Sequence, residues 1–337
     1  MTNKLIYGDN LEGMQWLLNN GFEGKIDLVY IDPPFATGGT FSIDKSGRVA
    51  TISRSKDAHI AYSDTLKGDD FIVFLKERVS LIHKLLSDRG SLYLHIDYKI
   101  GHYVKVMLDS IFGIENFRND ITRIKCNPKN FERTGFGNIK DMILFYTKGN
   151  NPIWNNPRFK ADDKDIAQLY NKIDKNGRRY TTVPIHAPGE TSGETSKPFK
   201  GMLPPKGRHW RCSVEELEQL DKDGLIEWSK NGNPRRINYA DEHVYKKAQD
   251  IWEFKDPANP SYPTEKSIDM LDFIVKASSN EGSIVLDCFC GSGTTLKAAE
   301  QNDRFWIGID RSELAIKTTK NKLGLSVYDF ISLDEKE

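Results

Sequence analysis

The segment from Ile26 to Phe35 (IDLVYIDPPF) places the tightest constraint on the fold of this chain. Residues 26–31 are apolar, β-branched or aromatic apart from one acid, which is typical of a strand buried on both faces of a sheet. Asp32-Pro33-Pro34 must end that strand, because proline donates no backbone hydrogen bond and disfavours helical backbone in the residue before it. We therefore expect these residues and Phe35 at the carboxyl end of a strand, the edge where open α/β sheets bind ligands.

The same four residues suit chemistry on an aromatic amine. The exocyclic NH2 of adenine or cytosine is a poor nucleophile, because its lone pair is delocalised into the ring. The Asp32 carboxylate and the Pro33 carbonyl can each accept one of its hydrogens, while the Phe35 ring can stack on a base turned out of the helix. A stiff turn after a strand would use the same residues, so this segment alone leaves both interpretations open.

Length and composition predict an ordinary globular protein. The 337 residues allow one large domain with an insertion or two domains, and 38% hydrophobic with 28% charged residues is a common balance. No apolar stretch is long enough to cross a membrane, and the polar start does not resemble a signal peptide, so we expect a cytoplasmic protein without a membrane partner. The four cysteines have neither C-x-x-C nor zinc spacing, which predicts reduced thiols and no metal site.

Alternating strand and helix patterns at both ends of the chain indicate an α/β fold. Predicted strands cover residues 5–7, 26–31, 91–96, 118–125, 142–146, 283–287 and 305–310. Predicted helices cover residues 11–18, 69–86, 100–111, 264–278, 294–301 and 313–323. Residues 36–64 are rich in Gly, Ser, Thr and Asp with little periodicity, which predicts a long loop.

From 149 to 258 the pattern changes to prolines, glycines, tryptophans and charges, which predicts an irregular inserted module. Residues 1–148 and 259–337 would then form one domain around it. The net charge of zero argues against a general polyanion binder but allows a local basic face. Within the insert, basic and aromatic residues suited to DNA phosphates and stacked bases gather at Lys206, Arg208, Trp210, Arg211, Arg235 and Arg236. A loop-rich subdomain with solvated basic side chains is the alternative.

A second site is indicated by the order strand, Phe289-x-Gly291-x-Gly293, helix, strand and acid. The glycines let the backbone approach a ligand closely, and the amino end of the helix helps to orient it. Asp310, at the end of the following strand, could accept hydrogen bonds from ribose hydroxyls. Leu296 occupies the third glycine position of G-x-G-x-x-G, which argues against a dinucleotide. A plain tight turn between strand and helix is the alternative.

Three segments in this order resemble the motifs of the β-group, permuted amino DNA methyltransferases, which use S-adenosylmethionine. They are Asp32-Pro33-Pro34-Phe35, Tyr262-Pro263-Thr264-Glu265-Lys266 and Phe289-Cys290-Gly291-Ser292-Gly293, and the resemblance covers nearly the whole chain. It implies a Rossmann-like methyltransferase sheet with an inserted recognition region.

The resemblance also implies roles for individual residues. Asp32 and the Pro33 carbonyl would bind the target amine, Pro34 would stiffen the loop, and Phe35, in place of the commoner tyrosine, would stack on the flipped base. The residues implied for the cofactor pocket are Asp9, Thr264, Lys266, Asp287, Phe289, Gly291, Gly293, Thr294 and Asp310.

The resulting hypothesis is methyl transfer from S-adenosylmethionine to the exocyclic amine of a flipped base in specific double-stranded DNA. Adenine N6 is favoured because the motif begins with Asp, whereas cytosine N4 enzymes of this group more often begin with Ser. A catalytically silent DNA-binding module and an RNA or protein-glutamine methyltransferase are the alternatives. The intact Asp32 and Phe35 favour turnover, and the basic insert favours DNA. The resemblance allows for a cognate restriction endonuclease as a partner and for a homodimer.

Overall fold

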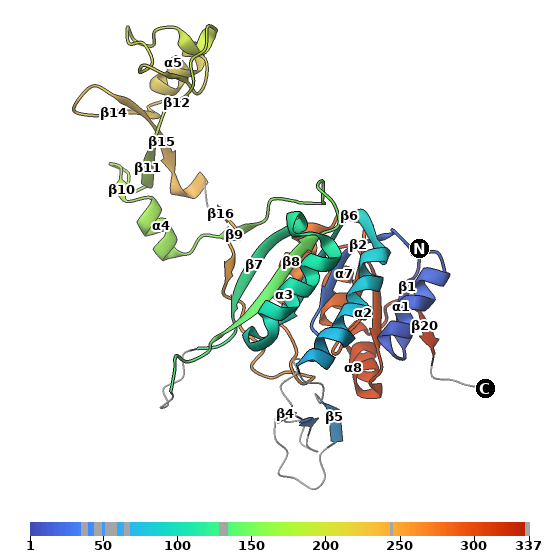
Figure 1. The fold of residues 1–337 in the computed structure, drawn as a ribbon. Helices are drawn as coiled ribbons and strands as arrows, with labels where there is room; N and C mark the ends of the chain where they lie inside the picture. Colours follow the sequence, from blue (N-terminus) through green and yellow to red (C-terminus); the bar gives the residue numbers. More distant parts are fainter. Residues whose placement is uncertain are drawn as a thin grey trace. The chain divides into compact units, whose positions relative to one another are not determined.

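A computed structural model of the chain describes residues 1–34, 40–43, 49–50, 59–63, 68–127, 134–242 and 245–333. The chain divides into two compact units, one made of Met1–Pro157 with Gln249–Glu337 and the other of Arg158–Ala248 (Figure 1). The boundaries predicted for the insert, 149 and 258, lie outside the second unit at both ends.

The first unit is built on a nine-stranded sheet in the order β17-β7-β8-β6-β2-β18-β19-β1-β20. All neighbouring strands are parallel except those that pair with β8, which is antiparallel to β6 and β7. The predicted α/β fold is confirmed. In chain order the strands are β1 Asn3–Tyr7, β2 Ile26–Ile31, β6 Leu86–Ile96, β7 Phe117–Ile124, β8 Lys140–Thr147, β17 Ile251–Trp252, β18 Ile284–Asp287, β19 Phe305–Asp310 and β20 Tyr328–Ser332.

Helices cover both faces of this sheet (Figure 1). One face carries α1 Asn10–Asn19, α2 Asp69–Leu85 and α3 Tyr98–Phe112, and the other carries α6 Ile268–Ser278, α7 Thr294–Gln301 and α8 Glu313–Leu323. Because both faces are covered, consecutive residues of the central strand β2 are apolar and buried: Leu28, Val29, Tyr30 and Ile31. The core therefore lies on both sides of the strand that leads into Asp32.

Three predictions about elements of the first unit were wrong. Residues 36–64 are not a continuous loop, because β3 Thr40–Ile43, β4 Val49–Ala50 and β5 His59–Ser63 form a small antiparallel sheet. The short apolar alternation there was hidden by the flanking Gly, Ser and Asp residues. Helix α6 begins at Ile268 rather than at 264, because Thr264 has a φ of 62° that no α-helix accommodates. Strand β20 at the sheet edge was not predicted.

The second unit, predicted as an irregular insert, consists of short elements around a core of its own. A four-stranded antiparallel sheet runs in the order β10-β11-β15-β14. Its strands are β10 Lys172–Ile173, β11 Arg179–Pro184, β14 Ile226–Trp228 and β15 Pro234–Tyr239. Two strand pairs and two helices complete the unit: β9 Arg158–Lys160 with β16 Tyr245–Lys247, β12 His186–Pro188 with β13 Arg208–Trp210, α4 Asp163–Leu169 and α5 Val214–Lys222. Ile185, Phe199, Trp210, Leu217 and Ile226 form the buried cluster.

Short 3-10 turns occur at Ile114–Asn116, Glu194–Ser196 and Ala240–Glu242. Among the helices that the structure describes, none combines the length and the apolar character needed to span a membrane.

Candidate active site

A cavity of about 420 Å³ lies in the first unit, where β2, β18 and β19 end. Most residues predicted for the catalytic and cofactor sites line it, although they come from distant parts of the chain. The predicted residues in its wall are Asp9, Asp32, Pro34, Thr264, Lys266, Asp287, Phe289, Gly291, Thr294 and Asp310. Pro33 and Gly293 are adjacent in sequence to wall residues, and Phe35 lies outside the described residues.

The glycine-rich turn after β18 needs its two glycines for different reasons. Gly291 and Gly293 both have left-handed backbone, with φ of 49° and 73°. A Cβ on Gly291 would lie 3.4 Å from the Tyr262 ring and would narrow the cavity. A Cβ on Gly293 would lie 2.8 Å from the Thr319 side chain, so this glycine allows α8 to pack closely against the turn.

Two carboxylates hold that turn in place. Asp310 accepts hydrogen bonds from the backbone N–H groups of Gly291 and Ser312, both at 2.9 Å, and burial raises its pKa. Asp287 accepts from the Thr295 hydroxyl at 2.5 Å and from the Phe289 N–H at 3.0 Å. Burial raises the pKa of Asp287 to about 7, and the charges of Asp32 and Asp310 add to the rise. Both acids are thus engaged with the backbone of the turn while they line the cavity.

The part of the cavity wall that contains Asp9 depends on Arg78, which the sequence analysis did not identify. Asp9 caps α1 by accepting from the Leu11 N–H at 2.8 Å, and it forms an ion pair with Arg78 at 3.2 Å. Arg78 also donates to Asn10 Oδ1 at 2.5 Å and lies 3.5 Å from the centroid of the Phe74 ring. The position of Arg78 in the sequence could have identified it. Arg78 falls in the buried stripe of α2, where an arginine needs a charged partner.

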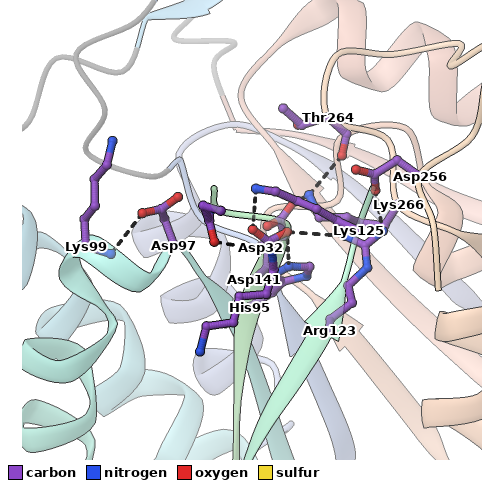
Figure 2. Close-up of polar contacts among 12 residues, drawn as sticks. Asp32, His95, Asp97, Lys99, Arg123, Lys125, Asp141, Asp256, Thr264 and Lys266 are labelled. Atoms are coloured by element: carbon purple, nitrogen blue, oxygen red, sulfur yellow. Dashed lines mark hydrogen bonds and ion pairs between the residues drawn. The ribbon is translucent and has the colours of Figure 1, made fainter. Parts of the chain in front are cut away.

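At the end of β2, Asp32 faces Lys266 (Figure 2). The Lys266 ammonium donates to Asp32 Oδ2 and, at 3.0 Å, to the Thr264 carbonyl. The other carboxylate oxygen, Oδ1, is buried and has no hydrogen-bond partner among the described residues. Buried polar atoms of folded proteins are nearly always satisfied, so this oxygen is an exception at the residue that lines the cavity at the end of β2.

A buried polar network adjoins Asp32 (Figure 2). The Tyr30 hydroxyl and His95 Nδ1 lie 2.9 Å apart, and His95 Nε2 lies 3.1 Å from Asp141. Asp141 in turn accepts from Lys125 at 2.6 Å and from Arg123 at 3.4 Å. Burial lowers the pKa of His95, so the imidazole is neutral between Tyr30 and Asp141. The network satisfies the polar groups of four neighbouring strands beneath the catalytic segment.

The residues predicted to bind DNA all lie in the second unit and differ in how far they are exposed. Lys206, Arg208, Arg211 and Arg236 are exposed. Arg235 is half-buried and donates to the hydroxyl and carbonyl of Thr182 at 3.0 and 2.6 Å. The prediction that Trp210 offers a stacking surface was wrong, because its ring is 2% exposed, packs in the core of the unit and donates its N–H to the Lys197 carbonyl.

Comparison with known proteins assigns the chain to a family. The model of the N6/N4 methyltransferases, described as DNA methylase, matches residues 26–321. The chain belongs to this family. As an N6/N4 DNA methylase it is an S-adenosylmethionine-dependent DNA methyltransferase, and the predicted family, cofactor and methyltransferase sheet are confirmed.

Named relatives agree with this assignment. The type II methyltransferase M.EcaI of Enterobacter cloacae is 43% identical, over 96% of this chain and 70% of that protein. M.HpaI of Haemophilus parainfluenzae is 36% identical, over 95% of this chain and 74% of that protein. The EcoPI Mod subunit of Escherichia phage P1 is 23% identical, and the chain spans 61% of its length. A DNA modification methylase of Thermus thermophilus, solved with S-adenosyl-L-methionine, shares the fold at 14% identity with a TM-score of 0.50, over 99% of this chain and all of that one.

Replacing Arg78 with Met should weaken S-adenosylmethionine binding about tenfold or more, because Asp9 would keep a partly buried charge without its partner. Isothermal titration calorimetry measures the affinity, and thermal unfolding checks that the variant is folded. Arg89→Met is the matched control, since Arg89 is exposed and bonds only weakly, at 3.3 Å, to the Asn151 carbonyl. An unchanged affinity in Arg78→Met would show that the Arg78 contact does not shape the cofactor wall.

Asp287 should make the stability of the protein depend on pH. Its folded pKa of about 7 lies above the unfolded value of about 3.9, so the folded state binds more protons between these values and the free energy of unfolding falls as pH rises through them. The stability of wild type relative to Asp287→Asn should therefore drop by about 2 kcal/mol from pH 5 to pH 8.

Urea unfolding at the two pH values measures this difference. Asp88→Asn, at an exposed position, is the control and should show the pH dependence of wild type. The same pH dependence in Asp287→Asn as in wild type would contradict the assignment.

Proposed function

We propose that this DNA methyltransferase transfers the methyl group of S-adenosylmethionine to N6 of an adenine turned out of double-stranded DNA. The observation that carries the proposal is the Asp32 carboxylate at the end of β2, which lines the same cavity as the glycine turn. A carboxylate at this place suits an N–H group of the target base.

The residues of the cavity fit S-adenosylmethionine. A volume of about 420 Å³ is within the range of small-ligand sites. The Asp310 carboxylate has lone pairs beyond its two backbone hydrogen bonds, which suits ribose hydroxyls. Phe74 and Phe289, whose ring centroids are 6.3 Å apart, offer an apolar wall to the adenine ring, and Gly291 keeps the backbone side open. When bound, the cofactor supplies a methyl group on a sulfonium, which is an electrophile.

The chain's own residues prepare the nucleophile. Asp32 and the Pro33 carbonyl would each accept one hydrogen of the amine, which draws its lone pair out of conjugation with the ring. The Asp32 carboxylate would stabilise the positive charge that develops on the nitrogen as the nitrogen–methyl bond forms and the methyl–sulfur bond breaks. The sulfur leaves as a neutral thioether, and the methylated nitrogen then loses its surplus proton to solvent. Pro34 limits the freedom of the backbone after Asp32. The proposal keeps Phe35 as the ring that stacks on the flipped base.

The second unit is proposed to recognise the target sequence. Its exposed Lys206, Arg208, Arg211 and Arg236 supply cations for phosphates and donors for guanine edges. Because relatives of the chain are named as type II methyltransferases and type III Mod subunits, we include a restriction endonuclease among its partners. A homodimer is the simplest assembly for reading a site with two-fold symmetry.

Cytosine N4 is the second candidate target. It presents the same two hydrogens as adenine N6, so the Asp32 site serves both amines. Adenine is preferred because the motif begins with Asp32, where the cytosine enzymes of this group more often have Ser.

Mass spectrometry of nucleosides should detect N6-methyladenine after unmodified bacterial DNA is incubated with the protein and S-adenosylmethionine. DNA incubated without the cofactor is the control. N4-methylcytosine instead would keep the mechanism and change the base. No methylated nucleoside on DNA of varied sequence, with cofactor binding verified, would contradict the proposal.

Replacing Asp32 with Ala should lower kcat at least about a hundredfold, because the amine loses its charged acceptor. The affinity for S-adenosylmethionine should stay within about threefold of wild type, since the glycine turn and Asp310 are unchanged. Single-turnover methylation and calorimetry measure the two quantities, with Asp88→Ala as the exposed Asp-to-Ala control. Full activity in Asp32→Ala would overturn the assignment of this carboxylate.

A further inference from the structure

The contact between Lys266 and Asp32 joins two segments that are 234 positions apart in the chain. Both side chains are largely buried, with 9% and 16% of their surfaces exposed. A lysine is rarely buried without a reason, because its ammonium loses hydration that only close partners replace. Lys266 directs its buried ammonium to the carboxylate at the end of β2 and to the carbonyl of Thr264 (Figure 2).

The geometry divides the Asp32 carboxylate into two unequal oxygens. Oδ2 accepts from the Lys266 ammonium, and Oδ1 is left without a partner among the described residues. Rotation of the carboxylate about its Cβ–Cγ bond would break the contact with Lys266. The ammonium thus fixes the orientation of the carboxylate.

The turn that carries Lys266 is itself held firmly. Thr264 has a φ of 62°, a left-handed conformation that is unfavourable for a residue other than glycine. Glu265 accepts from the Ser261 hydroxyl at 2.8 Å and from Lys322 of α8. Lys322 also donates to the Thr294 hydroxyl at 2.7 Å, so the turn is tied to the glycine loop. The strained Thr264 backbone directs its carbonyl to the Lys266 ammonium, which orients the lysine.

The charges of the cavity give Lys266 a second reason to lie there. Asp9, Glu265, Asp287 and Asp310 line the same cavity as Asp32, so five carboxylates share this space. The Lys266 ammonium beside Asp32 offsets the repulsion between these like charges.

We propose that Lys266 is a positioning residue for methyl transfer: by its contact with Oδ2 it fixes the orientation of the Asp32 carboxylate that is to accept from the target amine. This inference rests on the proposed function of Asp32. It differs from the role that the family resemblance implies for Lys266, which is cofactor binding. The difference is measurable, because a positioning residue affects turnover and a cofactor ligand affects affinity.

Lys266→Met is the direct test, since Met keeps the length of the side chain and removes its charge and donors. At saturating S-adenosylmethionine and DNA, kcat should fall about ten- to hundredfold, because the carboxylate is no longer held in a productive direction. The dissociation constant of S-adenosylmethionine should stay within about threefold of wild type. Should Lys266→Met fail to fold, Lys266→Gln gives the same comparison with a neutral polar side chain.

Three further variants separate the outcomes. Lys276→Met is the matched control, because Lys276 is exposed on α6 and pairs with Asp272 of the same helix, and it should behave as wild type. Lys322→Met should show the opposite pattern, a weaker cofactor affinity, because Lys322 braces the glycine loop. Asp32→Asn should be inactive.

If Asp32→Asn is inactive and Lys266→Met keeps the kcat of wild type, this inference is overturned and the proposed function stands. If Lys266→Met loses affinity for S-adenosylmethionine while kcat is unchanged, Lys266 is a cofactor ligand and the inference is wrong. Full activity of Asp32→Asn would overturn both.

Discussion

The parallel pairing of β2 with β18 is the contact on which the whole cavity depends. These strands come from opposite ends of the chain, yet Leu28 pairs with Val285 and Val29 with Leu286. Parallel neighbours end at the same edge of a sheet, so the segment after β2 and the glycine turn after β18 must meet there. The carboxylate that we propose binds the amine and the turn that we propose binds the cofactor are thereby placed at the same edge of the sheet. The order of the two motifs in the sequence has no influence on this geometry.

Ion pairs then fix the segments that follow the strands. Arg78 holds Asp9, Lys266 holds Asp32 and Lys322 holds Glu265, and each pair joins a loop of the cavity to another element. Buried pairs of this kind add little net stability, because desolvation offsets much of the Coulomb attraction. Breaking one is nevertheless costly, since it leaves an uncompensated charge. Their effect here is on geometry, because each pair holds a loop of the cavity against another element.

Local patterns predicted the parts of this fold that depend on neighbouring residues. Strand β19 and helix α8 have the predicted bounds, because buried runs, caps and breaking residues act over a few positions. Features that depend on residues far away in the sequence were harder to predict. In the sequence, Trp210 stands in a basic loop whether its ring is exposed or buried, and only the packing of Phe199 and Leu217 against it decides between the two.

The same limit applies inside the site. The motifs indicated that Asp32 and Lys266 belong to one site, but no spacing in the sequence predicts a direct contact between them. Chemistry carried by one segment was therefore predictable, and chemistry shared between segments was not.

The arrangement has an energetic consequence for catalysis. A loop that must order itself around a ligand loses conformational entropy at the moment of binding, and that loss weakens affinity or turnover. Here the turn at 262–266, the cap of α1 and the glycine turn are each held by side chains of the protein itself. The Asp32 carboxylate, for which the proposed reaction has a use, is likewise held by Lys266. A charge held in this way by the protein needs less reorganisation when a substrate binds.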